Sequence, residues 1–407
     1  MSRFESINPN NEPLRVNGQT SHIALREITL RQLGHMEADM TFDEKLYLLA
    51  QLDRIGVAEA QVWGIDADAA DLVVQARDRG IGLGIVFFGK PYFLDELRGD
   101  IRKARDCGAA MVCVNGRGPD RFLEYTGWTR QRMIDACVAA VKEAKDYGVA
   151  ISVGLAYSAQ SNLGFLEEFS GAIEAAGADR LYVPDSMGVA SPHTMHRMVA
   201  ALREVVRIPI EVHCHDDFGL AVANTLASIE AGATVVEVHV NGTDPERCGI
   251  ASLDEVVMAL ELLYGVDTGI KTEELTELSR LHEQMTGMNM PTTKPLVGPR
   301  AFNYRVASGE AASEPQRDHF YGSPMVLPFD PAIVGNRRTF LLGKYSGSNE
   351  VTQQLSSLGI TVTPAQMESV VALVQERGVA TKEPVSDDDL RYFVEVAQVA
   401  RPDGNGR

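Results

Sequence analysis

The order of short apolar runs is the feature that most constrains the fold of this 407-residue chain. From residue 22 onward, eight β-branched runs alternate with longer segments whose apolar residues recur at helical spacing. The expected strands span residues 22–26, 59–63, 82–88, 111–114, 150–153, 180–183, 209–213 and 235–239. The helical segments include 42–55, 67–79, 129–147, 163–176, 192–205 and 219–232. This alternation predicts an α/β fold in which helices join parallel strands.

Eight strands with helices between them are the number found in a closed (β/α)8 barrel, the TIM-barrel fold. Glycines lie where the expected helices should stop, at Gly80, Gly108, Gly148, Gly177 and Gly232. A doubly wound open sheet is the alternative, but no Gly-x-Gly-x-x-Gly follows the first strand, and this weakens it. We therefore expect a barrel over residues 21–285.

The pattern changes after about residue 285. Residues 286–345 are rich in Gly, Pro and polar residues and predict a mixed linker or lid subdomain. Helical patterns at 347–358, 364–377 and 386–399 predict a small helical C-terminal subdomain over 346–400. Residues 1–20 lack the apolar core of a signal peptide and are expected to be a flexible tail, and 401–407 a frayed end.

Composition excludes several classes of partner. The formal net charge of −18 argues against nucleic acid or an anionic membrane surface, because both bind basic faces. No apolar run approaches the length of a membrane span. The five cysteines are scattered without a Cys-x-x-Cys, which favours buried thiols in a reducing cytoplasm.

Polar residues stand where several expected strands end, and in a barrel the carboxyl ends of the strands carry the chemistry. Arg26 and Glu27 follow the first strand, Asp185 and Ser186 the sixth, and Asn241 the eighth. We expect these groups to converge on the mouth of the barrel.

His213 and His215 end the seventh strand, and positions two apart on a strand point to the same side. This is a metal-ligand spacing, although a polar pair that merely ends a strand remains the alternative on spacing alone. With Glu27 the two histidines would form a two-His, one-carboxylate set open to substrate oxygens. Arg26 would polarise an oxyanion near the ion, with a salt bridge at the barrel rim as its alternative role.

Several motifs together resemble the homocitrate synthase and 2-isopropylmalate synthase family, part of the DRE-TIM metallolyase superfamily, from about residue 22 to 400. They lie at residues 25–27, 40–45, 183–190, 213–224, 246–250, 329–335 and 342–347. Glu27 and Ile250 stand where 2-isopropylmalate synthases usually carry Asp and Asn, which is similar to the homocitrate synthase branch.

The resemblance implies a reaction and a cofactor. Members condense an acyl-CoA such as acetyl-CoA with a 2-oxo acid that chelates a divalent ion. By this resemblance, Glu27, His213 and His215 would hold the ion, which would be Zn, Mn, Mg, Fe or Co. The resemblance also implies a cytoplasmic homodimer in which the C-terminal subdomain of one chain covers the barrel of its partner.

The chain departs from the family at three places. Ile28-Thr-Leu30 replaces Gly-Glu-Gln, Ala156 and Gln160 replace a Glu and an Arg near the substrate, and the run 302–310 lacks the usual catalytic His. We therefore expect a 2-oxo acid other than 2-oxoglutarate, a role in specialised biosynthesis, and altered acid–base groups.

Replacement groups are available along the chain. His319 and Tyr321 are the candidate catalytic residues besides Arg26 and Glu27, although a surface loop residue is the slightly favoured interpretation of His319. The candidate substrate-binding residues are Arg26, Ser186, Asn241, Tyr157 and Tyr304, with Cys248 and His239 as weaker candidates near the mouth. Two other functions stay open: a metal-dependent aldolase or lyase that needs no acyl-CoA, and a non-catalytic metal-binding barrel.

Overall fold

The computed structural model describes residues 7–8, 10–11, 14, 23–33, 40–64, 67–89, 94–243, 247–304, 329–337 and 339–399. The chain divides into two compact units, Met1–Met290 and Pro291–Arg407. The first unit contains a barrel, and the second contains a small group of helices.

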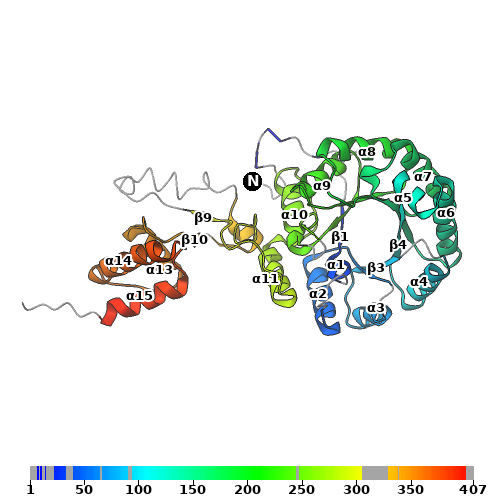
Figure 1. The fold of residues 1–407 in the computed structure, drawn as a ribbon. Coiled ribbons are helices and arrows are strands. Elements are labelled where there is room, and N and C mark those ends of the chain that lie inside the picture. The colour runs from blue at the N-terminus through cyan, green and yellow to red at the C-terminus, as the bar shows by residue number, and fades with distance from the viewer. Residues whose placement is uncertain are drawn as a thin grey trace, which may run out of the picture. The chain divides into compact units, whose positions relative to one another are not determined.

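Eight parallel strands close into a barrel in sequence order (Figure 1). They are β1 (Ala24–Glu27), β2 (Glu59–Trp63), β3 (Gly84–Gly89), β4 (Met111–Arg117), β5 (Ile151–Ala156), β6 (Arg180–Asp185), β7 (Ile210–Cys214) and β8 (Val235–Val238). The ring closes where β8 pairs with β1, with Arg26 opposite Glu237. Each expected strand overlaps one of these, so the predicted (β/α)8 barrel is confirmed.

Helices surround the strands as an outer ring in Figure 1. They are α1 (Thr29–Leu33), α2 (Phe42–Ile55), α3 (Ala69–Asp78), α4 (Leu94–Cys107), α5 (Asp120–Thr126), α6 (Arg130–Asp146), α7 (Leu163–Ala176), α8 (Pro192–Val205), α9 (Ala221–Glu230), α10 (Leu253–Leu262) and α11 (Leu275–Thr286). Short 3-10 turns lie at η1 (Ser158–Gln160), η2 (Val240–Gly242) and η3 (Thr272–Glu274). Within the described ranges, no helix is long and apolar enough to cross a membrane.

Local signals in the sequence set the helix ends. Thr41 begins α2 with a capping box, in which its hydroxyl accepts from the Glu44 amide and its own amide donates to the Glu44 carboxylate at 2.7 Å. Gly177 ends α7 with φ 98°, a left-handed conformation that glycine adopts without steric cost. The five glycines expected as helix stops all have positive φ. These stops return the chain to the next strand.

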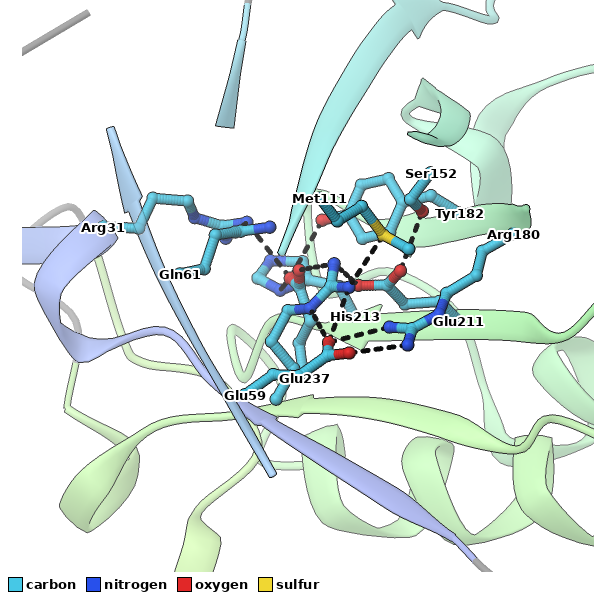
Figure 2. A network of polar contacts seen from close by, with 11 residues as sticks. Arg31, Glu59, Gln61, Met111, Ser152, Arg180, Tyr182, Glu211, His213 and Glu237 are labelled. Carbon is cyan, nitrogen blue, oxygen red and sulfur yellow. Dashed lines mark hydrogen bonds and ion pairs between the residues drawn. The ribbon is translucent and has the colours of Figure 1, made fainter. Parts of the chain in front are cut away.

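Buried charges fill the barrel interior in place of an entirely apolar core (Figure 2). The fully buried Arg26 forms an ion pair with Glu211 and another with Glu59 at 2.8 Å. Arg180 holds the other oxygen of Glu59 at 2.6 Å, and the Ser152 hydroxyl donates to Glu211 at 2.8 Å. Burial raises the pKa of Glu211 to about 7, against the opposing effect of the Arg26 charge. These carboxylates therefore depend on Arg26 for compensation of their buried charge.

The end of β8 is fastened to α11 by a second buried polar group. The His239 and His282 rings meet edge to face with centroids 5.3 Å apart, and neither side chain is exposed. The Asn241 amide donates to the Ser279 carbonyl at 3.1 Å and accepts from the Ser279 hydroxyl. Burial lowers the pKa of His282 to about 4, and burial together with His282 lowers the pKa of His239 well below its ordinary value.

The C-terminal unit is built around three helices, α13 (Ser348–Ser357), α14 (Pro364–Thr381) and α15 (Asp387–Val399). They coincide closely with the three helical patterns expected beyond residue 345. The two-stranded parallel sheet of β9 (Asn303–Tyr304) and β10 (Thr339–Phe340) and the 3-10 turn η5 (Pro331–Val334) precede them. One apolar cluster holds the unit together, formed by Leu342, Val351, Leu355, Val370, Val374, Val385, Leu390, Phe393, Val394 and Ala397.

Replacing Arg26 by Leu should lower the free energy of unfolding by about 3–5 kcal/mol, because Glu211 would keep a buried charge without its counter-ion. Urea denaturation followed by circular dichroism measures the change. The matched control is Arg54→Leu, which removes a partly exposed ion pair to Glu274 and should cost less than about 1 kcal/mol. Equal, small losses in both variants would contradict a stabilising role for the interior network.

The buried His282 predicts a loss of stability in acid. Its folded pKa of about 4 lies below the ordinary value of 6.5, so acid protonates the unfolded chain first. The stability that this difference contributes is complete above pH 6.5 and is lost as the pH falls towards 4. His282→Gln should therefore flatten the pH dependence of the unfolding free energy in this window, by up to about 3 kcal/mol.

Denaturation curves at a series of pH values from 7.5 downward test this expectation. His193→Gln, at an exposed position on α8, is the control and should keep the slope of the wild type. A His282→Gln variant whose slope equals that of the wild type would show that His282 is not the group responsible.

Candidate active site

The two histidines of β7 lie together at the carboxyl end of the barrel. The His213 and His215 rings meet edge to face with centroids 4.7 Å apart, and both side chains are buried. The His215 amide donates to the Asp185 carbonyl at 3.2 Å, and a bridge to Ile250 holds its other side. Burial, followed by His213 and Arg247, lowers the pKa of His215 to about 2. His215 is therefore neutral, which is the form that binds a metal ion.

A buried carboxylate lies behind His213. The Nδ1 atom of His213 is 2.9 Å from an oxygen of Glu237, and Figure 2 shows Tyr182 and Arg31 on the same carboxylate. The Tyr182 hydroxyl donates to it at 3.1 Å and the Arg31 guanidinium at 3.1 Å. Burial alone would raise the pKa of Glu237, but Arg31 and His213 lower it well below its usual range. A carboxylate in this position orients a histidine whose other nitrogen can bind a metal ion.

Glu27, the expected third metal ligand, is engaged elsewhere. Its carboxylate accepts from the Thr29 amide at 3.0 Å, from the Val240 amide at 3.1 Å and from the Thr29 hydroxyl. Burial raises the pKa of Glu27 to about 7, although these hydrogen bonds lower it. Among the residues that the structure describes, no three His, Cys, Asp or Glu side chains are arranged to hold one ion. The structure thus brings His213 and His215 together without Glu27, and the three-ligand set stays a prediction.

Arg26 was expected at the mouth, but its guanidinium lies deeper in the barrel. Its partners are Glu59, the first residue of β2, and Glu211, one inward position before His213 on β7. In this arrangement Arg26 serves as a buried counter-ion, and its role towards an oxyanion stays a prediction. Arg31 of α1 contacts the Glu237 carboxylate that faces His213, at 3.1 Å, and Arg26 lies 3.9 Å from the other oxygen of Glu237.

Two of the expected substrate-binding residues meet at the ends of β5 and β6. The Tyr157 amide donates to the Ser186 hydroxyl at 2.9 Å, and Tyr157 adopts the left-handed conformation with φ 62°. Asn241, in contrast, uses both ends of its amide within the contact to α11. The Cys248 thiol is exposed.

Three further residues predicted for the site do not belong to the described part of the barrel unit. Tyr304 belongs to β9 of the C-terminal unit. His319 and Tyr321 fall outside the described residues.

Three residues that contact the predicted site were not anticipated from the sequence: Arg31, Glu237 and Arg247. Arg247 donates to Asp217 at 2.8 Å and to the Ser186 carbonyl at 2.7 Å, and so ties together the loops after β6 and β7. The alternation of β8 offered a signal for Glu237, because it places this residue on the same face as His239. The contacts that these three residues form join parts of the barrel unit that are distant in the chain, and no sequence pattern predicts them.

Comparison with known proteins agrees with this architecture. The family model described as HMGL-like matches residues 22–281, more than half of the chain. Homocitrate synthase AksA of Methanopyrus kandleri is 33% identical over 399 residues, which cover 96% of each chain. A putative (R)-citramalate synthase CimA of Archaeoglobus fulgidus is 34% identical and covers 89% of this chain and 72% of that protein. A probable 2-isopropylmalate synthase of Methanopyrus kandleri is 36% identical, with 83% and 66% covered.

Solved structures share the fold. An HMG-CoA lyase of Bacillus subtilis superposes with a TM-score of 0.60 at 19% identity, over 69% of this chain and 97% of the lyase. A lyase of Acinetobacter baumannii, solved with coenzyme A and 3-methylmalate, gives a TM-score of 0.56 at 17% identity, over 68% of this chain and 95% of that chain. Together with the family match and the extended similarity to the synthases, these findings show that the chain belongs to the HMGL-like family of the DRE-TIM metallolyase superfamily.

Proposed function

We propose that this protein is a divalent-metal-dependent acyltransferase that condenses an acyl-CoA with a 2-oxo acid by Claisen-type carbon–carbon bond formation, in specialised biosynthesis. The observation that carries the proposal is the similarity to homocitrate synthase AksA along 96% of both chains. The paired histidines at the barrel mouth support it, because they stand where a TIM barrel carries its chemistry.

The chain's own residues would hold the ion in the following way. His213 and His215 are the ligand pair, and Glu237 fixes the ring of His213 from behind. Glu27, whose carboxylate accepts from the Val240 amide at 3.1 Å, would complete the set. The bound divalent ion supplies Lewis acidity to the carbonyl of the 2-oxo acid.

Other residues are assigned to binding and proton transfer. Ser186 and Tyr157 line the mouth beside the histidines and would hold the substrate. His319 and Tyr321 are proposed for the proton transfers that form and quench the enolate of the acyl group, since the family's usual His has no counterpart in the run 302–310. The proposed assembly is a cytoplasmic homodimer in which the C-terminal unit of one chain covers the partner's barrel.

A metal-dependent aldolase or lyase is the second candidate. Ile28-Thr-Leu30 stands in place of the family's Gly-Glu-Gln segment, and the run 302–310 lacks the usual catalytic His. Loss of this segment and of this His favours a reaction that needs the ion but no acyl-CoA.

The first test measures release of free CoA thiol from acetyl-CoA with a panel of 2-oxo acids and metal-loaded protein. We expect CoA release with at least one acid and its loss when a chelator removes the metal. The rate of release should fall roughly a hundredfold or more in His213→Ala, because loss of this ligand removes several kcal/mol of transition-state stabilisation. His193→Ala on the exposed face of α8 is the control and should keep the wild-type rate.

The alternatives predict different results in the same assay. Absence of CoA release with every acid, combined with carbon–carbon cleavage of 4-hydroxy-2-oxo acids to a 2-oxo acid and an aldehyde, would favour the aldolase or lyase. A protein that neither turns over these substrates nor retains a divalent ion would support the non-catalytic barrel.

The second test concerns the carboxylate behind His213. Glu237→Gln should weaken metal binding by about 10–100-fold, because the ring of His213 loses its orienting carboxylate. Metal content during titration with a chelator measures the effect. Glu59→Gln is the matched control, since it removes a carboxylate from the Arg26 network without touching His213. Equal metal loss in both variants would mean that the effect arises from the interior charge balance.

A further inference from the structure

A cavity in the C-terminal unit is lined by a sequence motif that the proposed function does not use. The motif, Leu-Gly-Lys-Tyr-Ser-Gly, spans residues 342–347, and its first five residues line a cavity of about 310 Å³. Further lining groups come from Arg300, from Glu350 on α13, and from residues 378 and 382–384 at and after the end of α14. Pockets that bind small molecules begin at about this volume.

Hydrogen bonds hold the motif in place. The Gly343 amide donates to the Ser346 hydroxyl, and the Ser346 amide donates to the Gly343 carbonyl, both at 2.9 Å. The Gln375 side chain of α14 donates to the Ser346 carbonyl at 2.8 Å. A β-carbon on Gly378 would lie 2.6 Å from the Lys344 nitrogen, so this glycine lets α14 approach the motif closely. The wall of the cavity is therefore formed before a ligand binds, which lowers the entropic cost of binding.

Three cations line the cavity: Arg300, Lys344 and Lys382. Acidic residues outnumber basic ones in this chain by 56 to 38, so carboxylates are available for most cations. Within the part of the chain that the structure describes, none of these three side chains forms an ion pair. All three are exposed, so their charges can act on an anion that enters the cavity.

Two carboxylates line the same cavity but do not pair with these cations. Glu350 is 4% exposed, and its carboxylate accepts from the Gly347 amide at 2.9 Å, which engages it at the start of α13. Glu383 is exposed and follows Lys382 in the chain. The three cations and two carboxylates leave the lining with a net charge of +1, in a chain whose net charge is −18. This balance favours an anion as the ligand.

An exposed aromatic ring lies next to one of the cations. Tyr345 is 59% exposed, and the Lys344 ammonium lies 5.2 Å from the centroid of its ring. Aromatic faces stack on the flat rings of nucleobases, whereas ammonium and guanidinium groups bind phosphate oxygens. A ligand that carries both a base and a phosphate therefore matches both kinds of group in the lining.

We propose that this cavity binds a phosphorylated nucleotide. The phosphate groups contact Arg300, Lys344 and Lys382. The base lies against the ring of Tyr345. This site goes beyond the proposed function and does not depend on the reaction assigned to the histidines. Free nucleotides and the nucleotide end of coenzyme A both carry this chemistry.

Calorimetric titration of the full chain tests the proposal. The probes are ADP, adenosine 3′,5′-bisphosphate as the nucleotide end of coenzyme A, adenosine, and inorganic phosphate. We expect at least one of the two nucleotides to bind about tenfold or more tightly than adenosine, which lacks the charge-assisted contacts. Lys344→Gln and Lys382→Gln should each weaken nucleotide binding about tenfold and leave adenosine binding unchanged.

Two further variants separate the charges from the ring. Glu383→Gln removes a carboxylate from the lining and should strengthen nucleotide binding by about two- to fivefold, because an exposed charge contributes up to about 1 kcal/mol. A gain in affinity cannot arise from a variant that fails to fold. Tyr345→Leu should weaken nucleotide binding about fivefold or more and leave the binding of inorganic phosphate unchanged.

Arg391→Gln is the matched control, because Arg391 is an exposed cation of α15 in the same unit and does not line the cavity. It should bind every probe like the wild type. Equal affinity of the wild type for adenosine and for both nucleotides would overturn the proposal. The same holds if Arg391→Gln weakens nucleotide binding as much as Lys344→Gln does.

A titration with coenzyme A distinguishes the two sources of the ligand. Coenzyme A binding that Lys344→Gln weakens, without binding of ADP, would assign the cavity to the coenzyme. Binding of ADP without binding of coenzyme A would assign it to a free nucleotide. His213→Ala should keep nucleotide binding in either case, and its loss in this variant would overturn the proposal, because the ligand would then depend on the paired histidines.

Discussion

The ion pairs of Arg26 inside the barrel are the interaction on which the rest of the site depends. A guanidinium with no exposed surface is stable only because Glu211 and Glu59 compensate its charge, and Arg180 in turn completes the compensation of Glu59. This arrangement spans strands on different sides of the ring. It joins these strands through ion pairs and places buried charge inside the barrel.

A second set of buried polar contacts surrounds Glu237, next to the histidines. Glu237 is held by Arg31 and Tyr182, so it remains ionised and can face His213 at 2.9 Å. Glu237 thus lies in contact with both Arg31 and His213. Removing one member of this chain would leave another buried charge uncompensated, which explains why the interior is built of pairs.

Much of the site was predictable because it depends on strand alternation. The spacing of His213 and His215 places both rings on the inner face at the end of β7, as the structure shows. Glu27 illustrates where such reasoning ends. Its position at the end of β1 suggests a ligand, but the backbone amides of Thr29 and Val240 donate to its oxygens, and Val240 begins the 3-10 turn after β8, more than two hundred residues later in the chain.

Arg26 and Asn241 also show that strand alternation predicts which way a side chain points but not which partners it contacts. Alternation predicts that Arg26 points inward, but only the positions of Glu211 and Glu59 draw its guanidinium down below the histidines. Asn241 stands after β8 as expected, and Ser279 of α11 binds its amide.

The sequence by itself determined the order of strands and helices, the helix ends and the inward face of each strand. These depend on local periodicity, capping and glycine conformation, which act over a few residues. Only the tertiary structure decided which charges compensate one another and which carboxylate stands behind His213. The physical reason is that closing the barrel brings together side chains from distant strands at low dielectric, where the pairing of charges depends on distances of a few ångströms that no sequence spacing encodes.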